Sequence, residues 1–183
     1  FMALEGGRVF CIPDGYDVRG EPALDDVQYN LDPTYSAEAI AALGPGGSSA
    51  AGTSEALDGQ VFRPGTVGLN NLKASDYANV VFQSLNRVQP LRDFFLDKAR
   101  SAGCSSKVVR RFGEVVRKVW NPRAFKGQVS PHELMLAVAE ESGGRFAAGE
   151  QADPTGFLAW LLHTLHRGLA ARSEERRVGK ECP

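Results

Sequence analysis

Residues 68–85 decide the fold of this chain, and they read GLNNLKASDYANVVFQSL. The stretch opens with polar and turn-forming residues, and from Ser75 onward apolar residues recur at spacings of three and four. This spacing predicts an amphipathic helix that begins near Asp76 and follows a polar loop. A carboxylate at that position suits the positive end of the helix dipole and would cap the helix. The residues expected on the buried face are Tyr77, Val80, Val81, Ser84, Leu85 and Val88.

Around this stretch the sequence indicates a mainly helical protein with a small β part. The clearest helix is expected at residues 107–120, where valines and aromatic residues lie opposite a basic face. Residues 9–12 and 16–18 are expected to form two short strands joined by a Pro-Asp-Gly turn. The Gly- and Ser-rich residues 44–59 favour a flexible loop. Further helices are expected at residues 37–43 with Ser36 as N-cap, 91–98, 131–142 with Ser130 as N-cap, and 154–170 with Phe157, Leu158, Leu161, Leu162, Leu165 and Leu169 facing inward.

The composition is that of an ordinary globular protein. The 183 residues carry a formal net charge of −1, with 43% hydrophobic and 23% charged residues, which excludes a wholly disordered chain. The apolar runs are too short to cross a bilayer, and no basic segment followed by an apolar one opens the sequence. We therefore expect neither membrane association nor a secretory leader. Because the chain begins with Phe1, we interpret it as a fragment.

The cysteines and histidines give no recognisable disulfide or metal pattern. Cys11, Cys104 and Cys182 are far apart in sequence, which favours reduced thiols, and we expect the first two to be unreactive. His163 and His166 are spaced to meet on one helix face, but no third ligand accompanies them. We therefore expect no metal site and no cofactor in this chain.

Charge is strongly segregated along the chain. Residues 1–86 carry a net charge of −7, whereas residues 87–126 carry +8. A basic helix face is most often simply solvated, but this asymmetry favours a polyanionic or acidic partner. No aromatic RNA-binding motif is present, so any RNA contact is expected to involve the phosphate backbone. The residues expected to bind such a partner are Lys107, Arg110, Arg111, Arg117, Lys118, Arg123 and Lys126.

Residues 68–85 resemble the cysteine box of the ubiquitin-specific proteases, which reads G-L-x-N-L-G-N-T-C-Y-M-N-S-x-L-Q-x-L. Asp76 stands where that family has its nucleophilic cysteine, and Lys73 and Ala74 depart from the glycine and asparagine of the box. The residues that match the box are Gly68, Leu69, Asn71, Leu72, Tyr77, Asn79, Gln83 and Leu85.

Other segments extend the resemblance over residues 8–170, apart from the insert at 44–59. Residues 10–17 resemble the last strands of the family's ubiquitin-binding zinc finger, and residues 153–169 resemble a weakened form of its Q-Q-D-A-x-E-F-L helix. The motifs that resemble a splicing-associated branch of the family, which also has aspartate at the nucleophile position, lie at residues 111–114, 120–123 and 129–133.

The resemblance implies the helical, N-terminal half of a papain-like domain, preceded by the end of a zinc finger. Any zinc would be held by a part of that finger outside this chain. The domain organisation expected is a finger end at residues 1–31, a linker with the Gly/Ser-rich insert at 32–60, the half-domain at 61–171, and a tail at 172–183 that resembles a translated sequencing adaptor and that we interpret as non-native.

The chemistry of this family requires a thiolate, a histidine base and a donor for the oxyanion. Asp76 supplies no thiolate, and the family's downstream histidine box has no counterpart here. Asn71 matches the oxyanion-hole asparagine, but a lone donor does not catalyse. We expect Asn71 instead to hold its loop through bonds to the backbone. The sequence therefore predicts a pseudoenzyme without catalytic residues.

Three functions remain in competition. The first, implied by the resemblance, is a nuclear, non-catalytic scaffold that contacts spliceosomal proteins and assists tri-snRNP and spliceosome assembly in pre-mRNA splicing. The second is an active ubiquitin-specific cysteine protease, against which Asp76 argues. The third is a ubiquitin-binding module without turnover, in which the charge of Asp76 would face the carboxylate of the ubiquitin tail and weaken binding.

Overall fold

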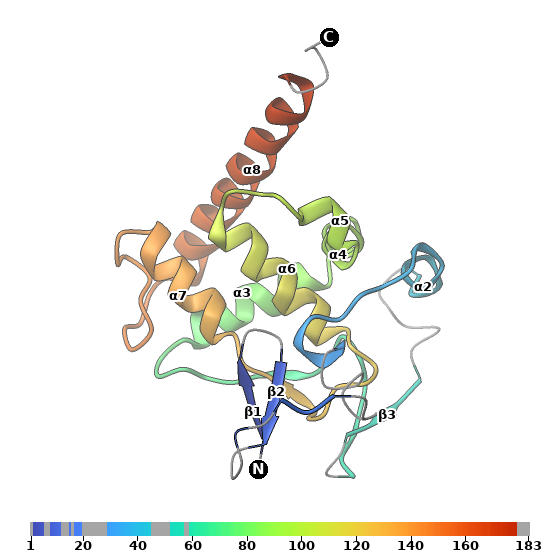
Figure 1. Cartoon of the computed structure of the whole chain (residues 1–183). Coiled ribbons are helices and arrows are strands. Elements are labelled where there is room, and N and C mark those ends of the chain that lie inside the picture. The colour runs from blue at the N-terminus through green and yellow to red at the C-terminus, as the bar shows by residue number, and fades with distance from the viewer. Residues whose placement is uncertain are drawn as a thin grey trace.

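Helix α6 (Lys107–Val119) lies at the centre of the fold, which Figure 1 shows as a computed structural model. The structure describes residues 2–5, 8–11, 15, 17–19, 29–44, 52–56 and 59–178. The architecture is mainly helical, as the sequence predicts. The helices that pack against α6 are α4 (Gln89–Leu96), α5 (Lys98–Ser101), α7 (His132–Glu141) and α8 (Pro154–Val178), and α3 (Asp76–Asn86) packs against α4 and α8.

The amphipathic pattern of α6 explains its central place. Its apolar face is completely buried, and Val108, Val109 and Phe112 are each 0% exposed. Ser106 caps the helix, because its hydroxyl accepts a hydrogen bond from the Val109 N–H. The Glu141 carboxylate, at the end of α7, accepts the Val108 N–H and the Ser106 hydroxyl. The first turn of α6 therefore has its free N–H donors satisfied by two neighbours.

Short strands tie the loops to the helices. Strand β5 (Gly68–Leu69) pairs in parallel with β6 (Gln128–Val129), so the loop before α3 lies beside the segment that leads into α7. Strand β3 (Ser54–Glu55) is antiparallel to β4 (Val61–Phe62). This pairing corrects the expectation that residues 44–59 form a loop throughout, because the end of that segment is held by a partner strand.

The N-terminal strands form a hairpin. Strand β1 (Met2–Glu5) pairs antiparallel with β2 (Arg8–Cys11), and Asp17 adds an isolated bridge to Phe10. Strand β2 agrees with the strand expected at residues 9–12, and the bridge replaces the second strand expected. Strand β1 is an additional strand that the sequence pattern does not predict. Whether this hairpin ends a zinc finger stays a prediction.

Several helix ends differ from those expected. The segment predicted as one helix at 91–98 is divided, because the Asp97 carboxylate accepts the N–H of Ala99 and starts α5. Pro131 rather than Ser130 is the N-cap of α7, and no side chain caps that helix. Helix α8 begins as expected, with the Asp153 carboxylate accepting the Gly156 N–H, and runs on past residue 170 to Val178.

Four residues expected on buried helix faces are exposed. Val80 is 62%, Val88 48% and Leu162 44% exposed, and Ser84 is also exposed. In α3 the buried face is turned relative to the expected one, because Ala78 and Phe82 are buried in place of Val80 and Ser84. In α8 the expected centre of the face holds, with Phe157 0% exposed, and only Leu162 is exposed.

Residues 29–44, which we call the strap, pack against the helices. The Tyr35 hydroxyl donates to the backbone oxygen of Arg117, at the end of α6, with 2.7 Å between the two atoms. The buried Arg92 of α4 donates to the oxygen of Gly44. Within the strap, α2 (Ala37–Ala42) is capped by the Ser36 hydroxyl, which accepts the N–H of Ala39 and confirms that prediction. The first part of the segment interpreted as a linker is therefore attached to the helical core.

Trp120 lies between the end of α3 and Arg92, the residue of α4 that bonds to the strap. It is 2% exposed, and its indole nitrogen donates to the Asn86 side-chain oxygen at 2.7 Å. The guanidinium of Arg92 lies 4.9 Å from its ring centroid. Gly65 has a φ of +80°, and a Cβ there would come within 2.5 Å of the indole ring. Glycine is thus required at residue 65 by its backbone conformation and by contact with the ring.

Candidate functional site

Asp76, at the nucleophile position of the cysteine box, is the first residue of α3. Its side chain is exposed, and one carboxylate oxygen accepts a hydrogen bond from the Gln151 amide at 2.8 Å. The expectation that Asp76 caps α3 is wrong, because the N-cap residue is Ser75. The Ser75 side chain makes no capping bond. A negative charge in the first turn still interacts favourably with the helix dipole.

Asn71 holds the loop that leads into α3. Its side-chain oxygen accepts the Ser75 N–H at 3.0 Å and lies 3.2 Å from the Ser75 hydroxyl oxygen. That hydroxyl oxygen in turn accepts the N–H of Leu72. The Asn71 side chain therefore bonds to the backbone of its own loop, which agrees with the role expected for it.

The two residues before Ser75 adopt a backbone conformation that costs free energy. Lys73 has a φ of 49° and Ala74 a φ of 52°, both in the left-handed region. A residue with a Cβ loses about 1–2 kcal/mol there, whereas glycine does not. The loop is held in place by the Gly149 N–H, which donates to the Lys73 oxygen at 2.8 Å. Strained positions of this kind are typical of functional sites and of sites derived from them.

Two further matches to the box serve the backbone of the same region. The Asn79 amide donates to the oxygen of Asn70, and the Gln83 amide donates to the oxygen of Val67 at 2.7 Å. These side chains fix the approach to α3 from about one and two turns into the helix. These two amide side chains therefore have a structural role in holding the loop, which does not depend on any reaction at the site.

Tyr77 supports the site from inside. Its ring is 4% exposed and contacts the Phe157 ring edge-on, with 5.4 Å between centroids. Burial raises the pKa of the Tyr77 phenol, and the negative charges of Asp76 and Glu150 raise it further. The phenol is therefore neutral at physiological pH and cannot act as a base beside Asp76.

Thiol and metal chemistry find little support in the part of the chain that the structure describes. Cys104 is a free cysteine and is 1% exposed, so it is not available to a substrate. His163 and His166 are both exposed on α8. No group of three or more His, Cys, Asp or Glu side chains among the described residues is placed to hold a metal ion. No described helix is long and apolar enough to span a membrane.

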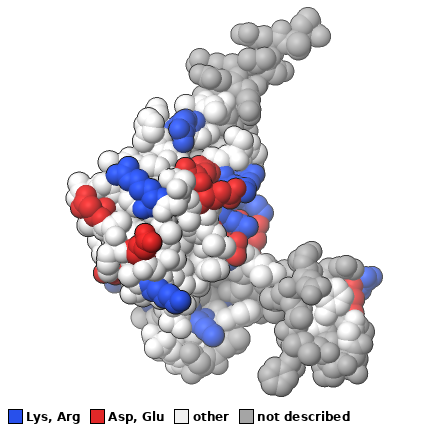
Figure 2. Space-filling model, turned by 90° about the vertical axis from the view of Figure 1, so that its left-hand side faces the viewer, with Lys and Arg blue, Asp and Glu red and all other residues white. Residues whose placement is uncertain are grey.

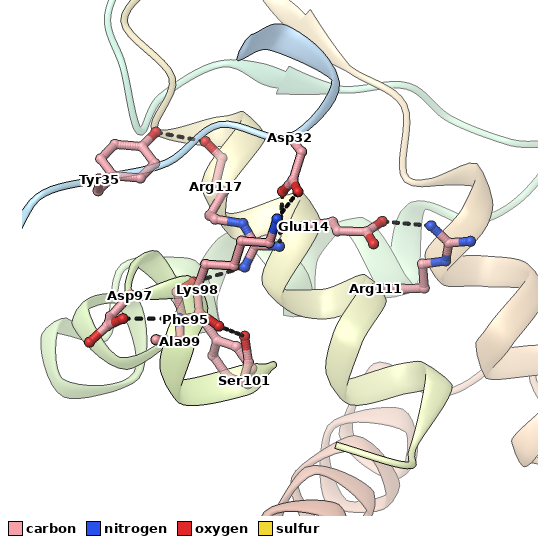
Figure 3. A network of polar contacts seen from close by, with 10 residues as sticks. All are labelled: Asp32, Tyr35, Phe95, Asp97, Lys98, Ala99, Ser101, Arg111, Glu114 and Arg117. Carbon is pink, nitrogen blue, oxygen red and sulfur yellow. Dashed lines mark hydrogen bonds and ion pairs between the residues drawn. The ribbon is translucent and has the colours of Figure 1, made fainter. Parts of the chain in front are cut away.

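Arg117 is not on a free basic face. It is 4% exposed, donates to the oxygen of Phe95 and lies 3.6 Å from a carboxylate oxygen of Asp32, in the strap. Figure 3 shows Asp32 between Arg117 and Lys98, with which it forms ion pairs, and Tyr35 bonded to the Arg117 backbone. Burial lowers the pKa of Arg117, and the Asp32 charge opposes that effect. The expectation that Arg117 is exposed is wrong because the strap covers it.

The bases at the start of α6 face acidic residues. Lys107 pairs with Glu140 at 2.6 Å, and Arg111 pairs with Glu114 at 2.8 Å and with Glu133 at 3.5 Å. These residues line a surface hollow of about 430 Å³ between α6 and α7, together with Arg110, which donates to the oxygen of Cys104. In Figure 2, Lys and Arg side chains lie interspersed with Asp and Glu side chains.

The remaining three bases lie at the other end of α6. Lys118 is in its last turn, and Arg123 and Lys126 follow in the next loop. Arg123 and Lys126 are exposed and Lys118 is half-buried. Among the described residues none of the three forms an ion pair, and the Arg123 guanidinium lies over the Tyr29 ring at 4.9 Å. The seven bases singled out in the sequence thus form three groups instead of one surface.

Sequence reasoning missed Gln151, Asp32 and Tyr35. Gln151 lies two residues before Asp153, where the family's Q-Q-D motif has its first glutamine, so the motif itself could have identified it. Asp32 and Tyr35 lie in an acidic, turn-rich segment without periodicity, and nothing in the sequence links them to α6.

Comparisons with known proteins agree with this geometry. Residues 67–182 match the model of the family described as ubiquitin carboxyl-terminal hydrolase. Ubiquitin carboxyl-terminal hydrolase 39 of Mus musculus and that of Homo sapiens are each 40% identical to this chain over 185 residues, which is 97% of this chain and 32% of theirs. The probable mRNA-splicing protein ubp10 of Schizosaccharomyces pombe is 36% identical over 165 residues, covering 90% of this chain. The chain spans 32% of the length of each of these curated relatives.

A solved structure has the same fold. The crystal structure of an essential yeast splicing factor superposes with a TM-score of 0.67 over 86% of this chain and 38% of that chain, at 20% identity. The fold expected from the sequence, the helical half of a papain-like domain, is confirmed by this likeness and by the family match.

Proposed function

This chain belongs to the ubiquitin carboxyl-terminal hydrolase family, and we propose that it is a non-catalytic member that acts as a scaffold in pre-mRNA splicing. Its partners are proteins of the tri-snRNP and the spliceosome, and it acts in the nucleus. The domain serves to present surfaces, and the ubiquitin-processing chemistry of the family has been lost.

The observation that carries the loss of chemistry is the state of Asp76. A carboxylate attacking an isopeptide carbonyl would form an anhydride, which is an unproductive intermediate for this reaction. Its carboxylate is also hydrogen-bonded to Gln151, and the preceding loop is held through Asn71 and Gly149. The start of α3 at Asp76 is therefore held to the loop that precedes α8. A hydrolase needs an activated nucleophile at this point, and a scaffold does not.

The splicing role is supported by what the chain resembles. One relative is named as a probable mRNA-splicing protein, and the structural neighbour is described as an essential yeast splicing factor. Both properties come to this chain only as part of the proposal. The retained loop, with Asn79 and Gln83 still bonded to its backbone, is what a domain kept for its shape would preserve.

Reaction with a ubiquitin C-terminal electrophile tests the loss of chemistry. We expect the protein to remain unlabelled, and we expect Asp76→Cys alone to release no product from a fluorogenic ubiquitin substrate, because Lys73 and Ala74 keep the altered loop. Labelling of the wild-type protein that disappears in Cys104→Ala would overturn the proposal. The matched control is Asp76→Asn, which keeps the size of the side chain and adds no thiol.

Association with splicing complexes tests the scaffold role. The tagged protein is recovered from nuclear extract, and the bound fraction is probed for tri-snRNP proteins and small nuclear RNAs. Recovery of these components by both wild type and Asp76→Asn is the expected result. Recovery of ubiquitin conjugates without tri-snRNP components would replace the proposal by the ubiquitin-binding or ubiquitin-processing alternative.

A further inference from the structure

Among the described residues, no carboxylate pairs with the positive charges of Lys118, at the end of α6, or of Arg123 and Lys126, in the loop after it. We propose that Lys118, Arg123 and Lys126 form a contact surface for the sugar-phosphate backbone of RNA, and that the start of α6 takes no part in it. The inference rests on the proposed function, because it names a partner for a splicing scaffold. It replaces the broader basic face predicted from the sequence by three residues.

Basic residues at the start of α6 are paired with carboxylates, whereas in the described part of the chain Lys118 and the bases of the next loop are not. Lys107 and Arg111 each lie within 3.5 Å of a glutamate oxygen, whereas Lys118, Arg123 and Lys126 have no such neighbour among the described residues. A paired base already interacts with a carboxylate, and that interaction must be exchanged for one with phosphate. An unpaired base gains the phosphate contact and releases a counterion from the RNA without that exchange.

The second argument is that the loop holding Arg123 is fixed before any partner binds. The Arg123 N–H donates to the Asn121 side-chain oxygen at 2.8 Å, and Asn121 is 2% exposed. The Asn121 amide in turn donates to the side-chain oxygen of Asn30, in the strap, at 2.8 Å. With its guanidinium stacked on Tyr29, Arg123 loses less conformational entropy on binding than a free surface arginine does.

The third argument concerns the kind of anion. An exposed guanidinium offers a planar set of donors that matches two phosphate oxygens, and lysines add point charges that follow a backbone of any sequence. Three bases within nine residues suit a repeating anion better than a single carboxylate. The sequence contains no aromatic RNA-binding motif, which agrees with a contact that does not read bases. Binding is therefore expected to be independent of RNA sequence and strongly dependent on salt.

The test measures RNA affinity as a function of salt concentration. The probe is a fluorescein-labelled single-stranded oligouridylate, and fluorescence anisotropy gives Kd for the wild-type chain and for the triple variant Lys118→Gln, Arg123→Gln, Lys126→Gln. Three lost contacts lower the slope of log K against log salt by about 2 and weaken binding by on the order of 100-fold at 0.1 M salt. The matched control is Lys107→Gln, Arg110→Gln, Arg111→Gln, which removes the same charge from the other end of α6 and is expected to change the slope by much less.

Three outcomes overturn the inference. They are equal slopes for wild type and triple variant, equal losses in the triple variant and the control, and equal competition by polyglutamate and by the unlabelled RNA at matched charge, which would assign the surface to an acidic protein. Circular dichroism of each variant checks that its helix content equals that of the wild type. The proposed function fails separately, because a protein that recovers no tri-snRNP components fails as a scaffold whatever its RNA slope.

Discussion

The loop before α3 and the junction between the strap and the end of α6 are both irregular segments, yet they are held in opposite ways. The loop, residues 71–76, exposes Asn71, Lys73 and Asp76, contains left-handed residues and is fixed by part-buried hydrogen bonds around Ser75. The junction buries Arg117, Trp120 and Asn121, each less than 5% exposed. The first region holds its shape through local side-chain bonds to the backbone, and the second is part of the core.

The difference indicates which region is free to change. Exposed hydrogen bonds exchange easily with water and contribute little to stability, whereas buried side chains contribute through packing and desolvation. Exposed positions of the loop before α3, such as Lys73 and Asp76, can therefore be altered at low cost. The following substitutions test this contrast.

Replacing Trp120 with Ala is expected to cause the largest loss. Truncation of a buried tryptophan leaves a cavity and costs about 4 kcal/mol of unfolding free energy, and here it also leaves Arg92 without its ring and Asn86 without its donor. Urea unfolding followed by circular dichroism measures the change. Trp160→Ala, at a half-buried ring in α8, is the control and should cost less. A loss for Trp120→Ala no greater than that of the control would contradict the contrast.

Replacing Lys73 with Gly is expected to stabilise the protein. Glycine removes the penalty of a φ of 49° and loses more entropy on folding, so the net gain is about 1 kcal/mol. The midpoint of urea unfolding should rise without a change in its slope. Ala159→Gly, at an exposed position inside α8, should lower the midpoint, because it costs about 1 kcal/mol of unfolding free energy. A fall in both variants would mean that the left-handed loop is not strained.

Replacing Gln151 with Ala is expected to have the smallest effect. Its bond to Asp76 is exposed, and surface changes of this kind usually stay within about 0.5 kcal/mol. Gln83→Ala, which removes the half-buried bond to the Val67 oxygen, should cost about 1 kcal/mol and is the matched control. Thermal unfolding of both variants in one buffer ranks them, and the reverse order would show that the bond between Gln151 and Asp76 is more important than its exposure suggests.

The sequence predicts the helices well where one period dominates. Helix α6 begins at Lys107 as expected, because its valines repeat at helical spacing. The sequence predicts burial less well in α3, where the buried face is turned, as Val80 shows. Basic residues on the polar side of α6 all look alike in the sequence, although Arg117 is covered by the strap and Lys107 is paired with Glu140.

The candidate site was found from the sequence, but its geometry was not. The box identifies Asp76 and Asn71, and the role expected for Asn71 is confirmed by its bonds to Ser75. The left-handed backbone at Lys73 and Ala74 could not be predicted, because both residue types disfavour it and only the surrounding contacts impose it. The contacts of the strap are hidden for another reason, since they join residues that are far apart in the chain.

The long-range contacts of the strap also determine when it can fold during synthesis. The Tyr35 hydroxyl bonds to a residue 82 positions later, and Asn30 to one 91 positions later. A ribosome adds about 5–20 residues per second, so the strap leaves it roughly 4–18 s before its partners have been made. Helices α3 and α4 can form early from local contacts, whereas closure of the strap over Arg117 is a late event of high contact order. A nascent chain that pauses before Asn121 would carry a strap without its partners. A chaperone would bind the strap during that pause.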